Sequence, residues 1–128
     1  MSSNKLVKIP GPDHPITIAA ATARVKVRVA GVTIADSVRA LVLREASYSP
    51  VYYLPAADID MSQLVPSSHT TYCPYKGDCG YHDIAVGGER SRNAVWSYGA
   101  PYDAVAAIAG HFAFYPGRVD GIEVGEAA

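Results

Sequence analysis

Residues 24–29 alternate strictly between basic side chains and valine, in the order Arg-Val-Lys-Val-Arg-Val. Successive side chains of a β-strand point to opposite faces, so this period of two predicts a strand with one apolar face and one solvated face. The Ala30-Gly31 pair that follows can turn the chain back on itself. The segment therefore predicts an antiparallel β-structure whose basic residues lie in water.

Short segments of the same kind recur along the chain, bounded by glycine, proline or other turn residues. We expect further strands at residues 16–20, 32–35, 38–44, 51–54, 69–76, 81–86, 94–98, 111–115 and 121–124. The polar segment 87–92 is expected to be a loop. The segment from Pro101 to Gly110 has a helical pattern, with proline suited to the first turn and glycine to the end. The predicted fold class is mainly β and antiparallel, with one short α-helix near residues 101–110.

The length and composition of the chain suit a single globular domain. With 128 residues, of which 49% are hydrophobic and 18% charged, it is long enough to bury a core without disulfides or metal ions. We expect one domain, 1–128, with its core at about 13–124. The ends at 1–12 and 125–128 are expected to be flexible.

Charge and cysteine content exclude several classes of protein. Eleven basic and twelve acidic residues give a formal net charge of −1, without the basic footprint of a nucleic-acid-binding protein. The segment before Pro10 is too short and broken for a signal peptide, and no apolar stretch is long enough to span a bilayer, so a cytoplasmic location is expected. Cys73 and Cys79 lack the additional Cys or His pairs of a zinc site. We therefore expect no metal, no cofactor, and no nucleic-acid or membrane partner.

Several motifs occur in order along the chain and together carry a family resemblance. They are His14-Pro15-Ile16-Thr17-Ile18, Ala35-Asp36-Ser37, Glu45 ahead of Pro50-x-Tyr52-Tyr53-x-Pro55, Thr71-x-Cys73-Pro74-Tyr75-Lys76-Gly77, and Ala94-x-Trp96-x-Tyr98. Over about residues 13–122 the chain resembles the domain-of-unknown-function family numbered 427. The resemblance implies a β-tent-like fold, similar in topology to the methionine sulfoxide reductase B domain. It implies no settled biochemistry, although some classifications label the family nucleotidyltransferase-like.

Lys76 and Glu45 are the leading candidates for a functional pair. Lys76 lies between Pro74 and Gly77 on a rigid turn, where it can bind an anionic group or, if desolvated, act as a base or nucleophile; an exposed hairpin lysine is the alternative. Glu45 ends an apolar run that draws its carboxylate toward an interior edge, where it needs a partner such as Arg44, Lys76 or a tyrosine hydroxyl. Such a pair fits catalysis or a structural ion pair, and we favour the structural ion pair.

Aromatic residues are numerous, with nine tyrosines and one tryptophan. Strand alternation places Tyr52 and Tyr53 on opposite faces and Trp96 and Tyr98 on the same face. Aromatic side chains with polar tips suit both a partly solvated core and a ligand pocket. We expect most of them in the core, and predict a ligand cleft rimmed by Glu45, Thr71, Lys76, Tyr81, Trp96 and Tyr98.

Cys73 is a further catalytic candidate, and its role depends on the register of the hairpin that follows it. A turn at 77–78 would place Cys73 opposite His82 and form a thiol–imidazole pair, whereas a turn centred on Lys76 would place it opposite Cys79, where a disulfide can form. A buried cysteine that acts as a small hydrophobe is the commonest outcome.

Three classes of function remain open. The first is a small-molecule-binding domain, enzymatic or not, that takes a polar or anionic molecule in the predicted cleft. The second is a homo-oligomeric assembly module, such as a homodimer formed through tyrosine-rich faces. The third is a nucleotidyltransferase-like enzyme, which predicts a magnesium site built from the carboxylates of Glu45, Asp58 and Asp60.

Overall fold

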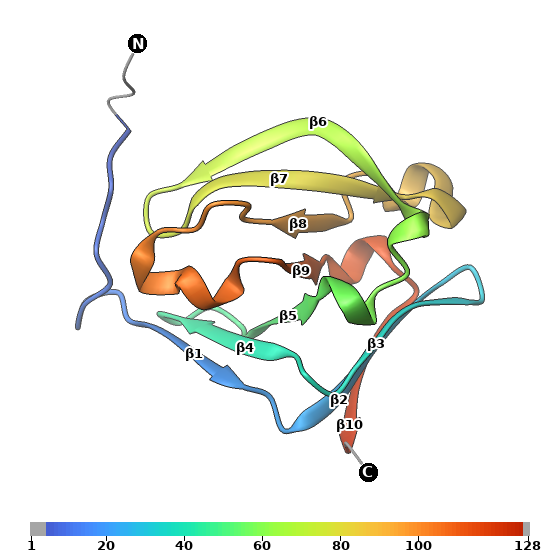
Figure 1. Cartoon of the computed structure of the whole chain (residues 1–128), viewed down its shortest axis with the longest axis horizontal. Coiled ribbons are helices and arrows are strands. Elements are labelled where there is room, and N and C mark those ends of the chain that lie inside the picture. Colours follow the sequence, from blue (N-terminus) through green and yellow to red (C-terminus); the bar gives the residue numbers. More distant parts are fainter. Residues whose placement is uncertain (1–4, 127–128) are drawn as a thin grey trace.

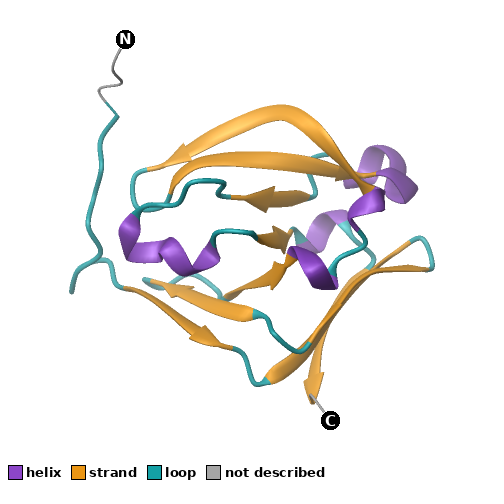
Figure 2. Ribbon diagram, viewed as in Figure 1, coloured by secondary structure: helices purple, strands orange, loops and turns teal. Residues whose placement is uncertain are grey.

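The computed structural model of the chain describes residues 5–126. Within this range the chain forms ten strands in two antiparallel sheets, with five short 3-10 segments between strands (Figures 1 and 2). The predicted mainly β, antiparallel fold class is confirmed, and the arrangement is consistent with a β-tent-like fold. No helical segment of residues 5–126 has the length and apolar character needed to cross a bilayer.

The larger sheet has seven strands in the order β1-β4-β5-β9-β8-β7-β6. Their bounds are β1 (Ile16–Ala20), β4 (Leu41–Glu45), β5 (Val51–Pro55), β6 (Leu64–Cys73), β7 (Gly77–Ile84), β8 (Val95–Ser97) and β9 (His111–Phe114). In β4 the consecutive residues Val42 and Leu43 are both buried, because both faces of this sheet are covered. Pro66 lies in β6, an edge strand, where a proline is tolerated because one side of the strand has no partner.

The smaller sheet has the order β10-β2-β3, with β2 (Ala23–Val29), β3 (Val32–Ser37) and β10 (Gly121–Glu126). Within β2, the alternation read from the sequence holds: Val25, Val27 and Val29 are buried. The β2–β3 connection is the Ala30-Gly31 pair, with φ of 50° and 79°. Positive φ at both residues is typical of the tight turn whose twist matches that of a hairpin.

The two faces of the larger sheet bury different clusters. One face packs on the smaller sheet and contributes Leu54, Val95 and Phe114 to a shared core with the valines of β2. The other face buries Leu43, Tyr53, Cys79, Tyr81, Tyr98 and Ala113 together with Val105 and Ile108. The candidate site lies on this second face.

The short helical segments are all of the 3-10 type: η1 (Ala56–Asp58), η2 (Met61–Gln63), η3 (Ala85–Ser91), η4 (Asp103–Ile108) and η5 (Pro116–Arg118). The α-helix expected near 101–110 is η4, which is interrupted at Val105 (φ −127°). Val105 and Ile108 are both fully buried in the core of the second face. In place of the expected α-helix, the segment forms two 3-10 turns that break at Val105.

The predicted loop at 87–92 is largely helical instead, because it is tied to the C-terminal part of the fold. The Ser91 hydroxyl is buried and donates to the Arg118 carbonyl at 2.7 Å. Gly87 packs so closely that an added Cβ would lie 1.9 Å from Ser91 Oγ. Local polarity predicted a loop, and the contact of Ser91 with Arg118 is not visible in the local sequence.

At the N-terminal end, residues 5–12 lie along the hairpin of β6 and β7. The Lys8 N–H donates to the Pro74 carbonyl at 2.9 Å, and the Tyr72 hydroxyl donates to the Leu6 carbonyl at 2.6 Å. At the other end, β10 continues to Glu126. The rest of the two ends predicted to be flexible, residues 1–4 and 127–128, lies outside the described residues.

Candidate functional site

Lys76 is held in place by the turn that joins β6 to β7. Residues 74–76 connect Cys73 to Gly77, which face each other in the hairpin. The Lys76 N–H donates to the Cys73 carbonyl at 3.2 Å, and the Lys76 carbonyl accepts from the Tyr102 N–H at 3.1 Å. Gly77 has a φ of 110°, a conformation that favours glycine. The backbone around Lys76 is therefore fixed, and its side chain is only 9% exposed.

Glu45 is the last residue of β4 and lies beside the start of β1, so it connects both strands to Lys76. Its Oε1 accepts a hydrogen bond from Lys76 Nζ at 2.5 Å, and its Oε2 lies 2.6 Å from His14 Nε2. The His14 ring in turn stacks on Tyr75, with 4.1 Å between ring centres and 6° between planes. Both carboxylate oxygens of Glu45 are thus occupied.

The charge state of Glu45 follows from these contacts. Burial raises the pKa of the Glu45 carboxyl, but hydrogen bonds from Lys76 and His14 outweigh burial and hold the pKa below its ordinary value. The carboxylate is therefore ionised at neutral pH, and its side chain is 13% exposed. The structure brings together the Glu45–Lys76 pair that the sequence suggested, with Lys76 as partner and not Arg44, whose side chain is exposed.

Lys76 keeps hydrogen-bonding capacity for a ligand. An ammonium group carries three N–H donors, and Glu45 takes one of them. Within residues 5–126, no second hydrogen-bond acceptor contacts Lys76 Nζ, although the ammonium lies 6.0 Å from the centre of the Tyr98 ring. Two donors of a buried cation are therefore available.

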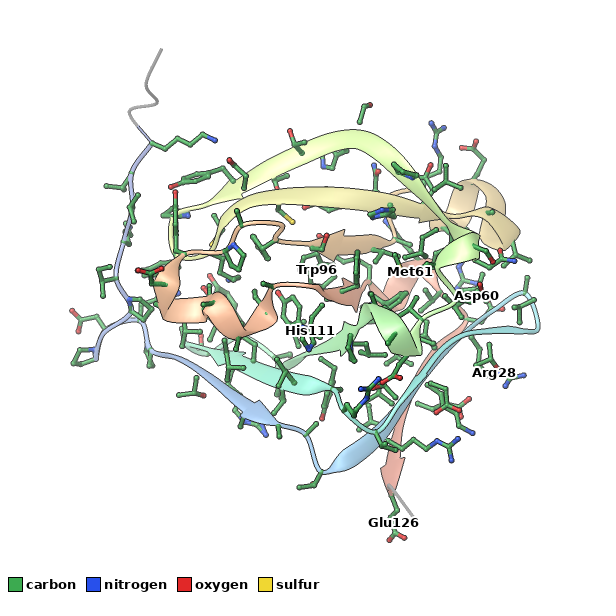
Figure 3. The ribbon with its side chains drawn as sticks, viewed as in Figure 1. Arg28, Asp60, Met61, Trp96, His111 and Glu126 are labelled. Carbon is green, nitrogen blue, oxygen red and sulfur yellow. The ribbon has the colours of Figure 1, made fainter. Side chains whose placement is uncertain are left out.

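Lys76 and Glu45 line a cleft of about 250 Å³. Strand pairing places Tyr81 opposite Trp96, and Trp96 opposite Ala113, so all three side chains point to the same face of the larger sheet. Figure 3 labels Trp96, a residue of β8, in the middle of the molecule. The full lining is Leu43, Glu45, Tyr48, Val51, Tyr53, Lys76, Tyr81, Trp96, Tyr98 and Tyr115.

Five of the six residues predicted from the sequence to rim a ligand cleft lie in this lining: Glu45, Lys76, Tyr81, Trp96 and Tyr98. The sixth, Thr71, is exposed and does not line the cleft. Its hydroxyl lies 2.9 Å from the Tyr81 hydroxyl, so Thr71 acts on the cleft only by orienting that tyrosine.

The tyrosines of the cleft are hydrogen-bond donors. Burial raises the pKa of Tyr53, Tyr81 and Tyr98 above the ordinary tyrosine value, so their hydroxyls stay protonated. The Tyr53 oxygen accepts from Trp96 Nε1 at 3.1 Å, which leaves its own proton to donate. Ammonium and hydroxyl donors thus surround the cleft, while each oxygen of its one lining carboxylate already has one partner.

Several residues of the site were not predicted from the sequence. His14 was a weak signal in the lead-in, and only the β1–β4 pairing brings it to Glu45. Its place at the head of the His14-Pro15-Ile16 motif was the available clue. Tyr48, Tyr53 and Tyr115 also join the cleft, and no sequence pattern separated them from the other tyrosines.

Both predicted registers for Cys73 are wrong. Cys73 faces Gly77, Cys79 faces Thr71, and His82 faces Pro66. The three-residue turn at 74–76 shifts the hairpin so that neither the thiol–imidazole pair nor the directly opposed cysteine pair forms. Cys73 and Cys79 are both free thiols that pack into the core of this face, and Cys79 is buried.

The three carboxylates considered for a magnesium site are not brought together. The Asp58 carboxylate accepts from Arg39 and from the Ser37 hydroxyl, each at 2.7 Å. Asp60 caps η2 by accepting from the Ser62 N–H at 3.2 Å, and Figure 3 labels it there. Nowhere in residues 5–126 do three His, Cys, Asp or Glu side chains gather closely enough to hold a metal ion.

Comparison with known proteins identifies the family. The family model described as Domain of unknown function (DUF427) matches residues 17–125. The comparison with curated proteins gave no significant match. The family match runs from the first strand to the last and includes the Glu45–Lys76 pair and the aromatic residues of the cleft, but starts after His14. Because this match covers most of the chain, the protein belongs to the DUF427 family.

Proposed function

We propose that the protein binds a small molecule with a carboxylate, phosphate or similarly acceptor-rich group in the cleft, with Lys76 as the main anchor. The observation that carries this proposal is the pair of unused N–H donors on a buried ammonium. The ammonium is positioned before any ligand arrives, because Glu45 and the turn backbone hold it. Preorganisation of this kind lowers the cost of binding.

The surrounding side chains favour an acceptor over a donor as the ligand group. Each oxygen of Glu45 already has one hydrogen-bond partner, whereas Lys76 and the tyrosine hydroxyls have protons to donate. A few polar groups that converge among aromatic walls are typical of small-molecule sites. A charge-assisted hydrogen bond contributes about 1.5–3 kcal/mol, so loss of the Lys76 ammonium should weaken binding by about tenfold or more.

Calorimetric titration with inorganic phosphate and with butyrate tests the proposal. Lys76→Met should weaken binding of whichever anion binds by about tenfold or more, whereas Lys8→Met removes one exposed lysine and serves as the matched control. Tyr98→Phe keeps the ring and removes one donor, so it should weaken binding by a smaller factor in a protein that retains its core.

Circular dichroism of each variant must first show the same folded spectrum. Equal affinity of folded Lys76→Met and wild-type protein would refute the assignment of Lys76 as anchor. Absence of heat with both anions would refute binding of an acidic group in this cleft.

A further inference from the structure

A second hollow of about 490 Å³ lies between the two sheets, on the opposite face of the larger sheet from the cleft. Its walls are mostly apolar and include Tyr52, Leu54, Phe114, Ile122 and Val124. We call this hollow the apolar groove. Its volume falls within the range of ligand pockets, about 300–1,000 Å³. Apolar hollows that open to the surface often mark binding sites, so the groove is a candidate for an apolar occupant.

The apolar groove and the cleft share two wall residues, Val51 and Trp96. They meet where the larger sheet is weakly joined: β5 and β9 pair only through Leu54 with Phe112 and Pro55 with His111. In Figure 1, β5 and β9 lie side by side near the centre of the molecule. With two residue pairs, the β5–β9 ladder is as short as the β8–β9 ladder, and both lie beside the residues that border the two hollows.

Trp96 lies where the cleft and the apolar groove approach each other. One side of the indole belongs to the cleft, where Nε1 donates to the Tyr53 hydroxyl and the ring packs 4.3 Å from the Tyr115 ring. Trp96 is also among the residues that line the apolar groove, so this residue borders both spaces. A molecule that reaches from one hollow to the other would pass Trp96.

We propose that the ligand is a small anionic amphiphile, whose acidic head binds Lys76 in the cleft and whose hydrocarbon tail occupies the apolar groove past Val51 and Trp96. This inference rests on the proposed function, because the head site is the same cleft. Each part of such a molecule matches one hollow. The acidic head matches the N–H donors of Lys76 in the cleft, and the hydrocarbon tail matches the apolar walls of the groove.

Fluorescence of Trp96 provides the assay, since it is the single tryptophan of the chain and borders both hollows. The probes are butyrate, decanoate and decanol. Burial of one methylene favours binding by up to about fourfold, so decanoate should bind by at least a hundredfold more tightly than butyrate if most of its tail enters the groove. Decanol, which lacks the acidic head, should bind more weakly than decanoate.

Matched substitutions locate the tail. Val124 and Val65 are both strand valines with 45% exposure, but only Val124 lines the apolar groove. Val124→Asn should weaken decanoate binding severalfold and leave butyrate binding unchanged, whereas Val65→Asn should affect neither. Lys76→Met should weaken binding of decanoate and butyrate by a similar factor and leave decanol unchanged.

The outcomes separate the two proposals. Decanoate and butyrate binding with equal affinity through Lys76 would overturn the amphiphile and leave the proposed function standing. Equal effects of Val124→Asn and Val65→Asn on decanoate would likewise overturn the tail site. Decanoate binding that is insensitive to Lys76→Met would refute the head site, and both proposals with it.

Discussion

Replacement of Lys76 by methionine is the most direct test of the electrostatics of the site. Methionine keeps an apolar stem of similar shape and removes the ammonium, which leaves the Glu45 carboxylate with His14 as its remaining partner. Removal of one partner from a fully buried ion pair costs about 3–5 kcal/mol. Because Glu45 keeps 13% exposure and the His14 contact, we expect a loss of about 2–3 kcal/mol in the free energy of unfolding.

The loss should depend on pH with a definite sign. In the wild type the pKa of Glu45 is lowered, so its ionised form stabilises the fold above the ordinary glutamate pKa of about 4.3, and that contribution is lost as pH falls through the lowered pKa. Without Lys76, two of the interactions that lower the pKa of Glu45 are lost, so we expect its pKa to rise. Protonation of Glu45 then removes the unpaired charge from the variant as pH falls toward about 4.3. The difference in the free energy of unfolding between variant and wild type should therefore narrow.

Urea denaturation at about pH 7 and about pH 4.5 measures both effects. For a chain of this size, 2–3 kcal/mol corresponds to a fall in melting temperature of about 6–15 °C. The double variant Lys76→Met/Glu45→Gln removes the isolated charge and should recover about 1 kcal/mol or more of the loss. Lys8→Met, which removes an exposed charge 5.9 Å from the Tyr75 ring, should cost less than about 1 kcal/mol.

Two results would refute this reasoning. One is a loss below about 0.5 kcal/mol for Lys76→Met at neutral pH, the size of an ordinary surface substitution. The other is a double variant no more stable than Lys76→Met alone, which would show that Glu45 is not stranded by removal of the ammonium.

Three further predictions concern the rest of the fold. Gly87→Ala should destabilise by about 1–3 kcal/mol through overpacking, while Gly99→Ala, where an added Cβ meets open space, should not; urea denaturation compares them. Arg39→Met should cost at most about 1 kcal/mol, since Arg39 is 61% exposed in its pair with Asp58, and a loss of several kcal/mol would contradict this. Cys79, at 2% exposure, should react with a thiol reagent only after unfolding, and prompt labelling of the native protein would contradict its burial.

Much of the architecture was readable from neighbouring residues. The period-two valines of β2 and the Ala30-Gly31 turn appear in the structure where the pattern placed them, whereas the strand expected at 38–44 is β4 at Leu41–Glu45, and Val38 is exposed. The proline and glycine that bracket residues 75–76 likewise indicated a rigid turn. These features depend on the φ and ψ preferences and side-chain directions of consecutive residues, which the sequence specifies directly.

Hairpin register could not be read in the same way. Two- and three-residue connections fit the same Pro-x-Lys-Gly run, and a shift of this kind changes every opposing residue. The structure uses residues 74–76 as the connection, so Cys73 faces Gly77 and neither predicted partner. Similarly, the helical pattern at 101–110 did not reveal that the segment would form 3-10 turns that break at Val105.

The site depends both on residue types, which the sequence contains, and on strand order, which the tertiary structure sets. The sequence by itself supplied the residue types, a lysine on a fixed turn, a glutamate at the end of an apolar strand, and tyrosines on alternating faces. Strand order decided which of them meet: β1 beside β4 brings His14 to Glu45, and the packing of two sheets opens the apolar groove. The reason is that contacts between residues about thirty positions apart, such as Glu45 and Lys76 with 31 between their numbers, are fixed by burial of whole sheets rather than by local preference.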